Sequence, residues 1–287
     1  PQAIPEVGLY EAGTKSWYTD FEAFRKNYAH YDPRRPWVGF FIYQANVVAG
    51  TTAHVDAVIA ALEKRGLNVM PVFSYPPEKA IEQYFLDADG KPRVEAVVAA
   101  SIKIGANPDT LIPLFKRLNV PVINAISVYS QTRAEWEASP VGLDIMERSW
   151  QLAMPEMAGL IQPTVFAAKE RFKDPDTGVE YMEERAIPER VEMLAKRVQR
   201  WVELRRKANR DKRVFLQYFN FPPGKEGVGA SFLNVVPESL WQVMTRMKQE
   251  GYNLDGMPAE KAALQEAVLE QGSNIPNWNH DMIEALA

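Results

Sequence analysis

The sequence offers few side chains for metal or acid–base chemistry. It has three histidines, His30, His54 and His280, and no cysteine, which excludes thiolate metal sites and cysteine nucleophiles. The histidines form no H-x-x-H or H-E-x-x-H pair, so we expect no metal site within this chain. His54 lies in the first turn of a predicted helix, just beyond the carboxyl end of a predicted strand, where ligands gather in α/β sheets. A solvated or capping histidine is the competing interpretation.

Glu156 is the second candidate. It follows Pro155 in the segment LAMPEMAG (152–159) and has apolar neighbours on both sides. A partly buried carboxylate there suits acid–base chemistry, whereas a carboxylate that caps the next segment has no chemical role. Both interpretations stay open, so we name no catalytic residue and keep His54 and Glu156 as candidate substrate-binding residues.

A glycine-rich loop, FNFPPGKEGVGAS (219–231), is the third candidate. Glycines let backbone N–H groups approach an anion or a planar ligand closely. An ordinary surface loop that needs positive φ is the competing interpretation. The spacing matches neither G-x-G-x-x-G nor G-x-x-x-x-G-K-[ST], and we expect no nucleotide to bind this chain. The candidate ligand-binding residues of this loop are Asn220, Gly224, Gly227 and Gly229.

A basic cluster ends the longest predicted helix, residues 188–206. Cations at this position complement the helix dipole, and contact with an acidic partner surface is the second interpretation. The cluster consists of Arg205, Arg206, Lys207, Arg210, Lys212 and Arg213.

Apolar runs alternate with amphipathic segments and predict the elements that position these residues. Strands are expected at 37–43, 67–73, 94–101, 120–126 and 163–170, and helices at 52–65, 78–86 and 109–118. This alternation predicts an α/β fold with doubly wound, mostly parallel sheets and flanking helices. A helix at 188–206, a strand at 214–219 and helices at 237–249 and 257–270 predict a second α/β unit. The expected domains are an N-terminal segment (1–36), a first α/β domain (37–187) and a second unit (188–287).

Length and charge also limit the possible functions. The chain has 287 residues and a net charge of −4, which disfavours a nucleic-acid partner because phosphate binding needs excess Lys and Arg. No apolar run approaches the ~18 residues of a membrane span, and no signal peptide is visible. The chain begins at Pro1 and ends within a predicted helix (279–287). We therefore expect a piece of a larger protein.

Several ordered segments together resemble one family, the cobaltochelatase large subunits and magnesium chelatase H subunits. The longest is WVGFFIYQANVVAGTTAHVDAVIAALEKRGLNVMPVF (37–73), with its T-A-H helix start and L-E-x-R-G-L-x-V-x-P-x-F strand. The others are IPEVGLY (4–10), EWEASPVGLDIMERSWQLAMPEMAGLIQP (135–163) and FNFPPGKEGVGAS (219–231).

The resemblance implies a function that composition does not show. Members of this family are large subunits that bind a tetrapyrrole and support insertion of cobalt or magnesium, a divalent metal ion, with ATP used by separate ATPase subunits. The implied substrate is haem, a hydrogenobyrinate-type ring or protoporphyrin. The implied partners are the remainder of the large subunit, the tetrapyrrole and the ATPase subunits. The chain by itself is not expected to be an active enzyme, and the expected location is the cytoplasm.

Two segments depart from the family pattern, SIKIGANP (101–108) and SFLNVVPESL (231–240). These departures suggest a divergent branch, and removal of iron from haem, with a periplasmic or membrane-associated location, is the alternative within the family. Alternatives of other classes are a non-catalytic scaffold that binds a partner subunit and an α/β domain that binds a sugar or nucleotide.

Overall fold

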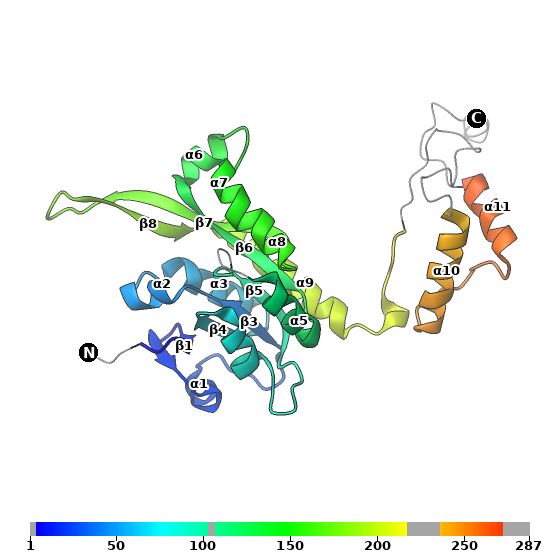
Figure 1. Cartoon of the computed structure of the whole chain (residues 1–287), viewed down its shortest axis with the longest axis horizontal. Coiled ribbons are helices and arrows are strands. Elements are labelled where there is room, and N and C mark those ends of the chain that lie inside the picture. Colours follow the sequence, from blue (N-terminus) through cyan, green and yellow to red (C-terminus); the bar gives the residue numbers. More distant parts are fainter. Residues whose placement is uncertain (1–3, 103–106, 217–235, 272–287) are drawn as a thin grey trace. The chain divides into compact units, whose positions relative to one another are not determined.

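The computed structural model describes residues 4–102, 107–216 and 236–271 (Figure 1). The chain consists of two units, Pro1–Arg205 and Arg206–Ala287. The glycine-rich loop, with Asn220, Gly224, Gly227 and Gly229, lies outside the described residues, as does His280.

An eight-stranded sheet forms the centre of the first unit, with strand order β2-β1-β4-β3-β5-β6-β7-β8. Its five central strands are parallel: β4 (Asn68–Ser74), β3 (Trp37–Phe41), β5 (Val94–Ala99), β6 (Val122–Thr132) and β7 (Ile161–Lys173). The outer strands run antiparallel to their neighbours: β1 (Val7–Glu11), β2 (Ser16–Tyr18) and β8 (Glu180–Ala186).

Helices cover both faces of this sheet. On one face, α3 (Ala53–Lys64) and α9 (Pro188–Arg206) pack on Val38 and Phe40 of β3. On the other face, α1 (Phe21–Asn27), the π-helical turn η1 (Ile81–Phe85) and α5 (Pro108–Leu118) pack on Phe41. The remaining helical elements are α2 (Gln44–Ala49), α4 (Pro77–Ala80), α6 (Arg133–Ala138), α7 (Ile145–Glu147), η2 (Arg148–Ala153) and α8 (Met154–Met157). The predicted doubly wound α/β fold is confirmed.

The strand order explains where a ligand site is expected. From β3 the chain passes through α3 to β4 on one side, and from β4 it crosses to β5 on the other side of β3. The order therefore reverses between β3 and β5, and doubly wound sheets bind ligands in the crevice outside the carboxyl ends of such strands.

The observed units differ from the expected domain boundaries. Residues 1–36 contribute β1, which pairs with β4, so this segment is an integral part of the sheet. The apolar side of α9 is buried in the core of the first unit through Val191, Leu194 and Val198. For this reason the first unit extends to Arg205 rather than ending at residue 187.

The described part of the second unit is helical. It contains a 3-10 turn, η3 (Asn209–Asp211), and two longer helices, α10 (Val236–Gln249) and α11 (Lys261–Gln271). The Asn209 amide donates to the backbone oxygen of Glu250 at 2.7 Å and ties the turn to the end of α10. Of the strand expected at 214–219, residues 214–216 form irregular backbone and the rest lie outside the described residues.

Candidate functional site

A cavity of about 480 Å³ lies at the carboxyl ends of the central strands of the first unit. Four aromatic side chains line it: Tyr43 just after β3, Tyr129 of β6, Trp150 of η2 and Phe166 of β7. A second cavity, of about 290 Å³, shares Ile42, Tyr43, Ala45 and Trp150 with the first and adds Tyr75. We call these two cavities together the crevice. Its volume falls in the range of small-molecule sites.

The aromatic side chains of the crevice support one another. Trp150 meets Tyr129 edge to face, with ring centroids 6.3 Å apart, and the Lys169 ammonium lies 3.4 Å above the Tyr129 ring. Phe166, which also lines the crevice, stacks against His54 with ring centroids 6.0 Å apart. Such walls suit a flat apolar ligand, because aromatic faces stack favourably.

A polar network centred on Glu184 forms the other part of the wall. One Glu184 carboxylate oxygen accepts a hydrogen bond from the Ser127 hydroxyl at 2.7 Å, and the other accepts from the Asn46 amide at 3.1 Å. The second oxygen also lies 3.5 Å from Nε2 of His54. Four elements, α2, α3, β6 and β8, thus converge on a single carboxylate.

His54 is the buried member of this network, with 3% of its surface exposed. Burial lowers its pKa below the ordinary value, against the opposing pull of the Glu184, Asp56 and Glu183 carboxylates. The ring is therefore neutral near pH 7. Its Nδ1 atom is buried and has no hydrogen-bond partner among the described residues. With the ring proton on Nε2, the nitrogen that lies 3.5 Å from Glu184, Nδ1 carries a free lone pair that accepts a proton or a hydrogen bond.

Tyr43 adds a second perturbed group to the same wall. Its side chain is 39% exposed, yet burial around the hydroxyl and the Glu184 charge raise its pKa above the ordinary value. Tyr43 therefore keeps its proton at neutral pH and offers an O–H donor at the rim of the crevice.

The start of α3, which carries His54, is held by the N-terminal strands. The Tyr10 hydroxyl donates to Thr52 and to Asp56, each at 2.9 Å, and Lys15 forms an ion pair with Asp56. These contacts hold the first turn of α3, and with it His54, against β1 and the turn that follows it.

A buried carboxylate, Glu147 of α7, links the segments that carry Tyr129 and Trp150 of the crevice. Its oxygens accept from the Tyr129 backbone N–H at 2.7 Å, the Ser130 hydroxyl at 2.6 Å and the Gln151 amide at 2.6 Å. These bonds join the end of β6 to η2, and so fix the positions of Tyr129 and Trp150.

The structure places the two predicted candidates differently: His54 lines the crevice and Glu156 does not. His54 lies in the wall of the crevice as a buried side chain, and the solvated alternative is wrong. Glu156 is exposed on α8 and is absent from the residues that line the crevice, so its expected partial burial is wrong. The reason is that Pro155 and Ala158 take the buried positions of this turn.

The residues that sequence reasoning missed are Asn46, Ser127, Glu147 and Glu184. Ser127 was missed because β6 continues to Thr132, six residues past the expected end of the strand. Glu184 lies on β8, whose residues EYMEERA form no apolar run. The turn DPDTG (174–178), flanked by two extended segments, is the signal that would have indicated this hairpin.

Within the described ranges, no group of three or more His, Asp or Glu side chains is arranged to hold a metal ion. The helices of the same ranges include none that is long and apolar enough to cross a membrane.

Comparison with known proteins identifies the family. All of residues 1–287 match the model of the CobN/Magnesium Chelatase family. The chain belongs to this family. Among its relatives, the chloroplastic magnesium-chelatase subunit ChlH of Oryza sativa subsp. indica is 36% identical over 261 residues, which cover 86% of this chain and 18% of the relative.

Relatives of lower identity have names from the same family. The magnesium-chelatase H subunit of Rhodobacter capsulatus is 31% identical, over 94% of this chain and 23% of its own. The aerobic cobaltochelatase subunit CobN of Pseudomonas aeruginosa is 28% identical, over 96% and 22%. The catalytic subunit of cobaltochelatase from Mycobacterium tuberculosis has the same fold, with a TM-score of 0.65 and 22% identity over 94% of this chain and 22% of that one. The CobN/magnesium chelatase chain described here spans about a fifth of the length of these relatives.

The lowered pKa of His54 predicts how stability depends on pH. An unfolded chain protonates this histidine below about pH 6.5, whereas the folded chain resists protonation there. The unfolded state then binds more protons, so this contribution to stability is complete above pH 6.5 and is lost as the pH falls below it. We expect the difference in unfolding free energy between wild type and His54→Gln to shrink from pH 7.5 to pH 5 in urea titrations.

Val58→Ala provides the control for this measurement, because it truncates a buried side chain of the same helix that carries no titratable group. The difference between wild type and Val58→Ala should stay constant over the same range. A difference for His54→Gln that is also constant would contradict the assignment of a buried neutral ring.

Proposed function

We propose that this chain is the part of a chelatase large subunit that grips a tetrapyrrole during insertion of cobalt or magnesium. The observation that supports this most is the crevice at the carboxyl ends of β3, β5 and β6, where an aromatic wall faces a neutral histidine and a carboxylate. A tetrapyrrole is flat and apolar and carries pyrrole N–H groups at its centre. The crevice offers groups that match each of these properties.

The chemistry assigned to the crevice residues is binding and proton transfer. Tyr129 and Trp150 stack on the macrocycle, while Nδ1 of His54 accepts a proton from a pyrrole nitrogen. Glu184 stabilises the imidazolium that forms, because an adjacent carboxylate favours the charged ring. Glu156 remains a candidate for the same work as an exposed carboxylate, and Asn220, Gly224, Gly227 and Gly229 remain candidates for contact with the ring.

Family membership supports insertion over the alternatives. The relatives compared above are named magnesium chelatases and a cobaltochelatase, which favours metal insertion over removal of iron from haem. By the same inference, the partners are the rest of the large subunit and the ATPase subunits of a chelatase. The location that we propose is the cytoplasm. The macrocycle is of the protoporphyrin or hydrogenobyrinate type.

Replacement of Trp150 tests this function. In an absorbance titration of the full chain with deuteroporphyrin IX, we expect a saturable shift of the Soret band. Trp150→Leu should weaken this binding by about tenfold, since loss of one stacked ring and its buried area costs about 1.4 kcal/mol.

Trp136→Leu is the matched control. Trp136 is a half-buried tryptophan of α6 outside the crevice, so its loss should leave porphyrin affinity within twofold of wild type. No saturable binding, or equal affinities of Trp150→Leu and wild type, would reject a porphyrin site in the crevice.

A further inference from the structure

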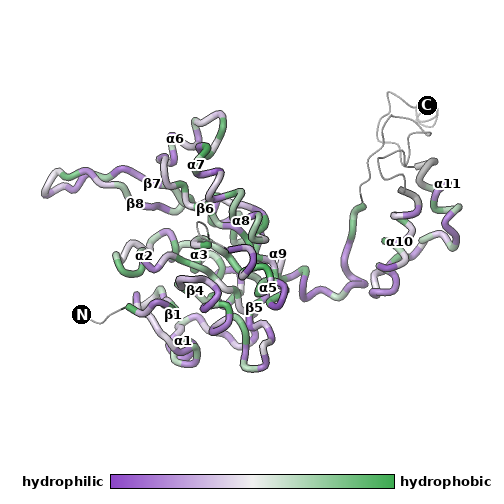
Figure 2. Tube along the Cα trace, in the orientation of Figure 1, coloured by the Kyte–Doolittle hydropathy of each residue, from purple (hydrophilic) through white to green (hydrophobic). Residues whose placement is uncertain are grey.

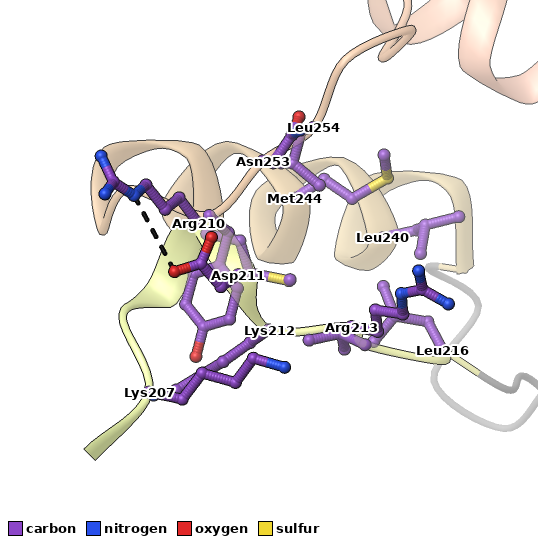
Figure 3. A pocket seen from close by; sticks show the side chains of 13 residues that line it. Lys207, Arg210, Asp211, Lys212, Arg213, Leu216, Leu240, Met244, Asn253 and Leu254 are labelled. Carbon is purple, nitrogen blue, oxygen red and sulfur yellow. Dashed lines mark ion pairs between the residues drawn. The ribbon is translucent and has the colours of Figure 1, made fainter. Parts of the chain in front are cut away.

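The second unit has a cavity of its own, of about 770 Å³, between the segment after α9 and α10 (Figure 3). Two stretches of chain line it, from Lys207 to Leu216 and from Leu240 to Leu254. All of the lining residues belong to the second unit. The crevice residues contribute nothing to it, so the cavity is a separate feature of the chain.

The charge of this cavity is strongly positive. Its wall holds four cationic side chains and one carboxylate, Asp211, which lies 3.9 Å from Arg210. Lys212 donates to Asn209 at 2.8 Å. Lys207 and Arg213 form no ion pair with any residue in the described part of the chain. Two cations thus line a cavity without a counter-ion there.

The helix dipole does not account for these cations. The dipole favours basic residues only within the last turn of a helix, and α9 ends at Arg206. Within that last turn, Arg205 serves the first unit, because it pairs with Glu95 at 3.3 Å and donates to the backbone oxygen of Asn119. The cations that line the cavity all lie beyond the helix.

The floor of the cavity is apolar. Leu240, Met244 and Met247 lie four and three residues apart on α10 and so share one face of that helix. Figure 3 shows Leu216 and Arg213 of the other stretch near Leu240. Methionine thioethers are polarisable and make favourable contacts with aromatic rings. An apolar floor below a cationic rim matches a ligand with an apolar body and acidic substituents.

We propose that this cavity binds the carboxylate side chains and the ring edge of an amphipathic polycarboxylate of the tetrapyrrole type. The choice of a tetrapyrrole rests on the proposed function. Carboxylates pair with ammonium and guanidinium groups in charge-assisted hydrogen bonds, and Lys207 and Arg213 supply these donors. A phosphate ligand fits less well, because it has no apolar body to cover the floor of Leu240, Met244 and Met247.

Methyl NMR of the full chain, labelled at the methionine methyl carbons, tests this site locally. The probe is deuteroporphyrin IX, which carries two carboxylates, and its dimethyl ester is the neutral counterpart. We expect the probe to shift the methyl resonances of Met244 and Met247 upfield through its ring current, with saturation. The resonances are assigned with Met244→Leu and Met247→Leu.

Removal of the unpaired cations should weaken this binding. For the double variant Lys207→Gln/Arg213→Gln we expect about tenfold weaker binding at the two methyl groups, since two charge-assisted contacts with the carboxylates of the probe are lost. The matched control, Lys196→Gln/Lys248→Gln, removes two exposed cations outside the cavity and should bind as wild type does. Both pairs are exposed, so thermal unfolding midpoints should agree.

The outcomes separate this inference from the proposed function. Equal binding of the dimethyl ester, or no effect of the double variant relative to its control, would overturn the carboxylate site. If Met244 and Met247 do not respond while the Soret shift still depends on Trp150, the inference fails and the proposed function stands. Response of both methyl groups with no dependence on Trp150 would support this cavity and reject the crevice.

Discussion

Replacing Phe166 by alanine is expected to lower the free energy of unfolding by about 4 kcal/mol. Phe166 is 1% exposed, belongs to the core between the sheet and α9, and stacks on His54. Truncation of a buried phenylalanine removes apolar contacts and leaves a cavity, which together cost about 3–5 kcal/mol. Because the phenyl ring forms one wall of the crevice, the same variant should also lose the restraint on the His54 ring.

Phe172, six residues further along the same strand, is the matched control. It stacks on Tyr181 in the outer part of the β7–β8 ribbon and is only half-buried, so Phe172→Ala should cost about 1 kcal/mol. Urea unfolding followed by circular dichroism measures both variants. Equal losses at the two positions would contradict the assignment of Phe166 to the core.

Replacement of Glu147 by leucine should also lower the free energy of unfolding, for a different reason. Glu147 is 1% exposed and accepts hydrogen bonds from Tyr129, Ser130 and Gln151. Leucine has similar size but accepts none of them. The Ser130 hydroxyl also bonds Asp144, and the Gln151 amide also bonds the Ser127 backbone oxygen. Of these three donors the Tyr129 N–H therefore loses its acceptor, at a cost of about 1–3 kcal/mol. We expect a loss of about 2 kcal/mol, with weaker porphyrin binding because the aromatic wall is no longer fixed.

Glu137→Leu serves as the control for this change. Glu137 is an exposed carboxylate of α6 that pairs with Arg133 on the surface, and exposed pairs contribute little to stability. Its unfolding midpoint in urea should equal that of wild type. A Glu147→Leu variant as stable as Glu137→Leu would show that these donors find other acceptors.

Sequence reasoning succeeded where burial of an element leaves a regular pattern of apolar residues. The runs at 37–43 and 67–73 correspond to β3 and β4 within two residues, because strands covered by helices on both faces are continuously apolar. The long helix at 188–206 corresponds to α9, since its apolar stripe faces the core. The fold class depends on these elements, and it was predictable for that reason.

The polar half of the candidate site was not predictable in the same way. His54 was found because it directly follows a buried strand, but its partner Glu184 lies 130 residues later. Glu184 sits in a strand of mostly charged residues at the edge of the sheet, where no apolar pattern marks its position. Glu147 likewise lies in a short polar segment, and its burial depends on the donors of β6 and η2 around it.

The position of β8 has a consequence for motion. β8 pairs with β7 alone, and the ribbon that the two strands form is largely hydrophilic towards its turn (Figure 2). Edge elements with few buried apolar contacts open at a fraction of the global unfolding free energy. Detachment of β8 would withdraw Glu184 from His54 while the central strands stay folded. Amide hydrogen exchange should therefore be faster along β8 than along β3. The charge that faces the histidine is thus held by an edge strand that opens more readily than the central strands.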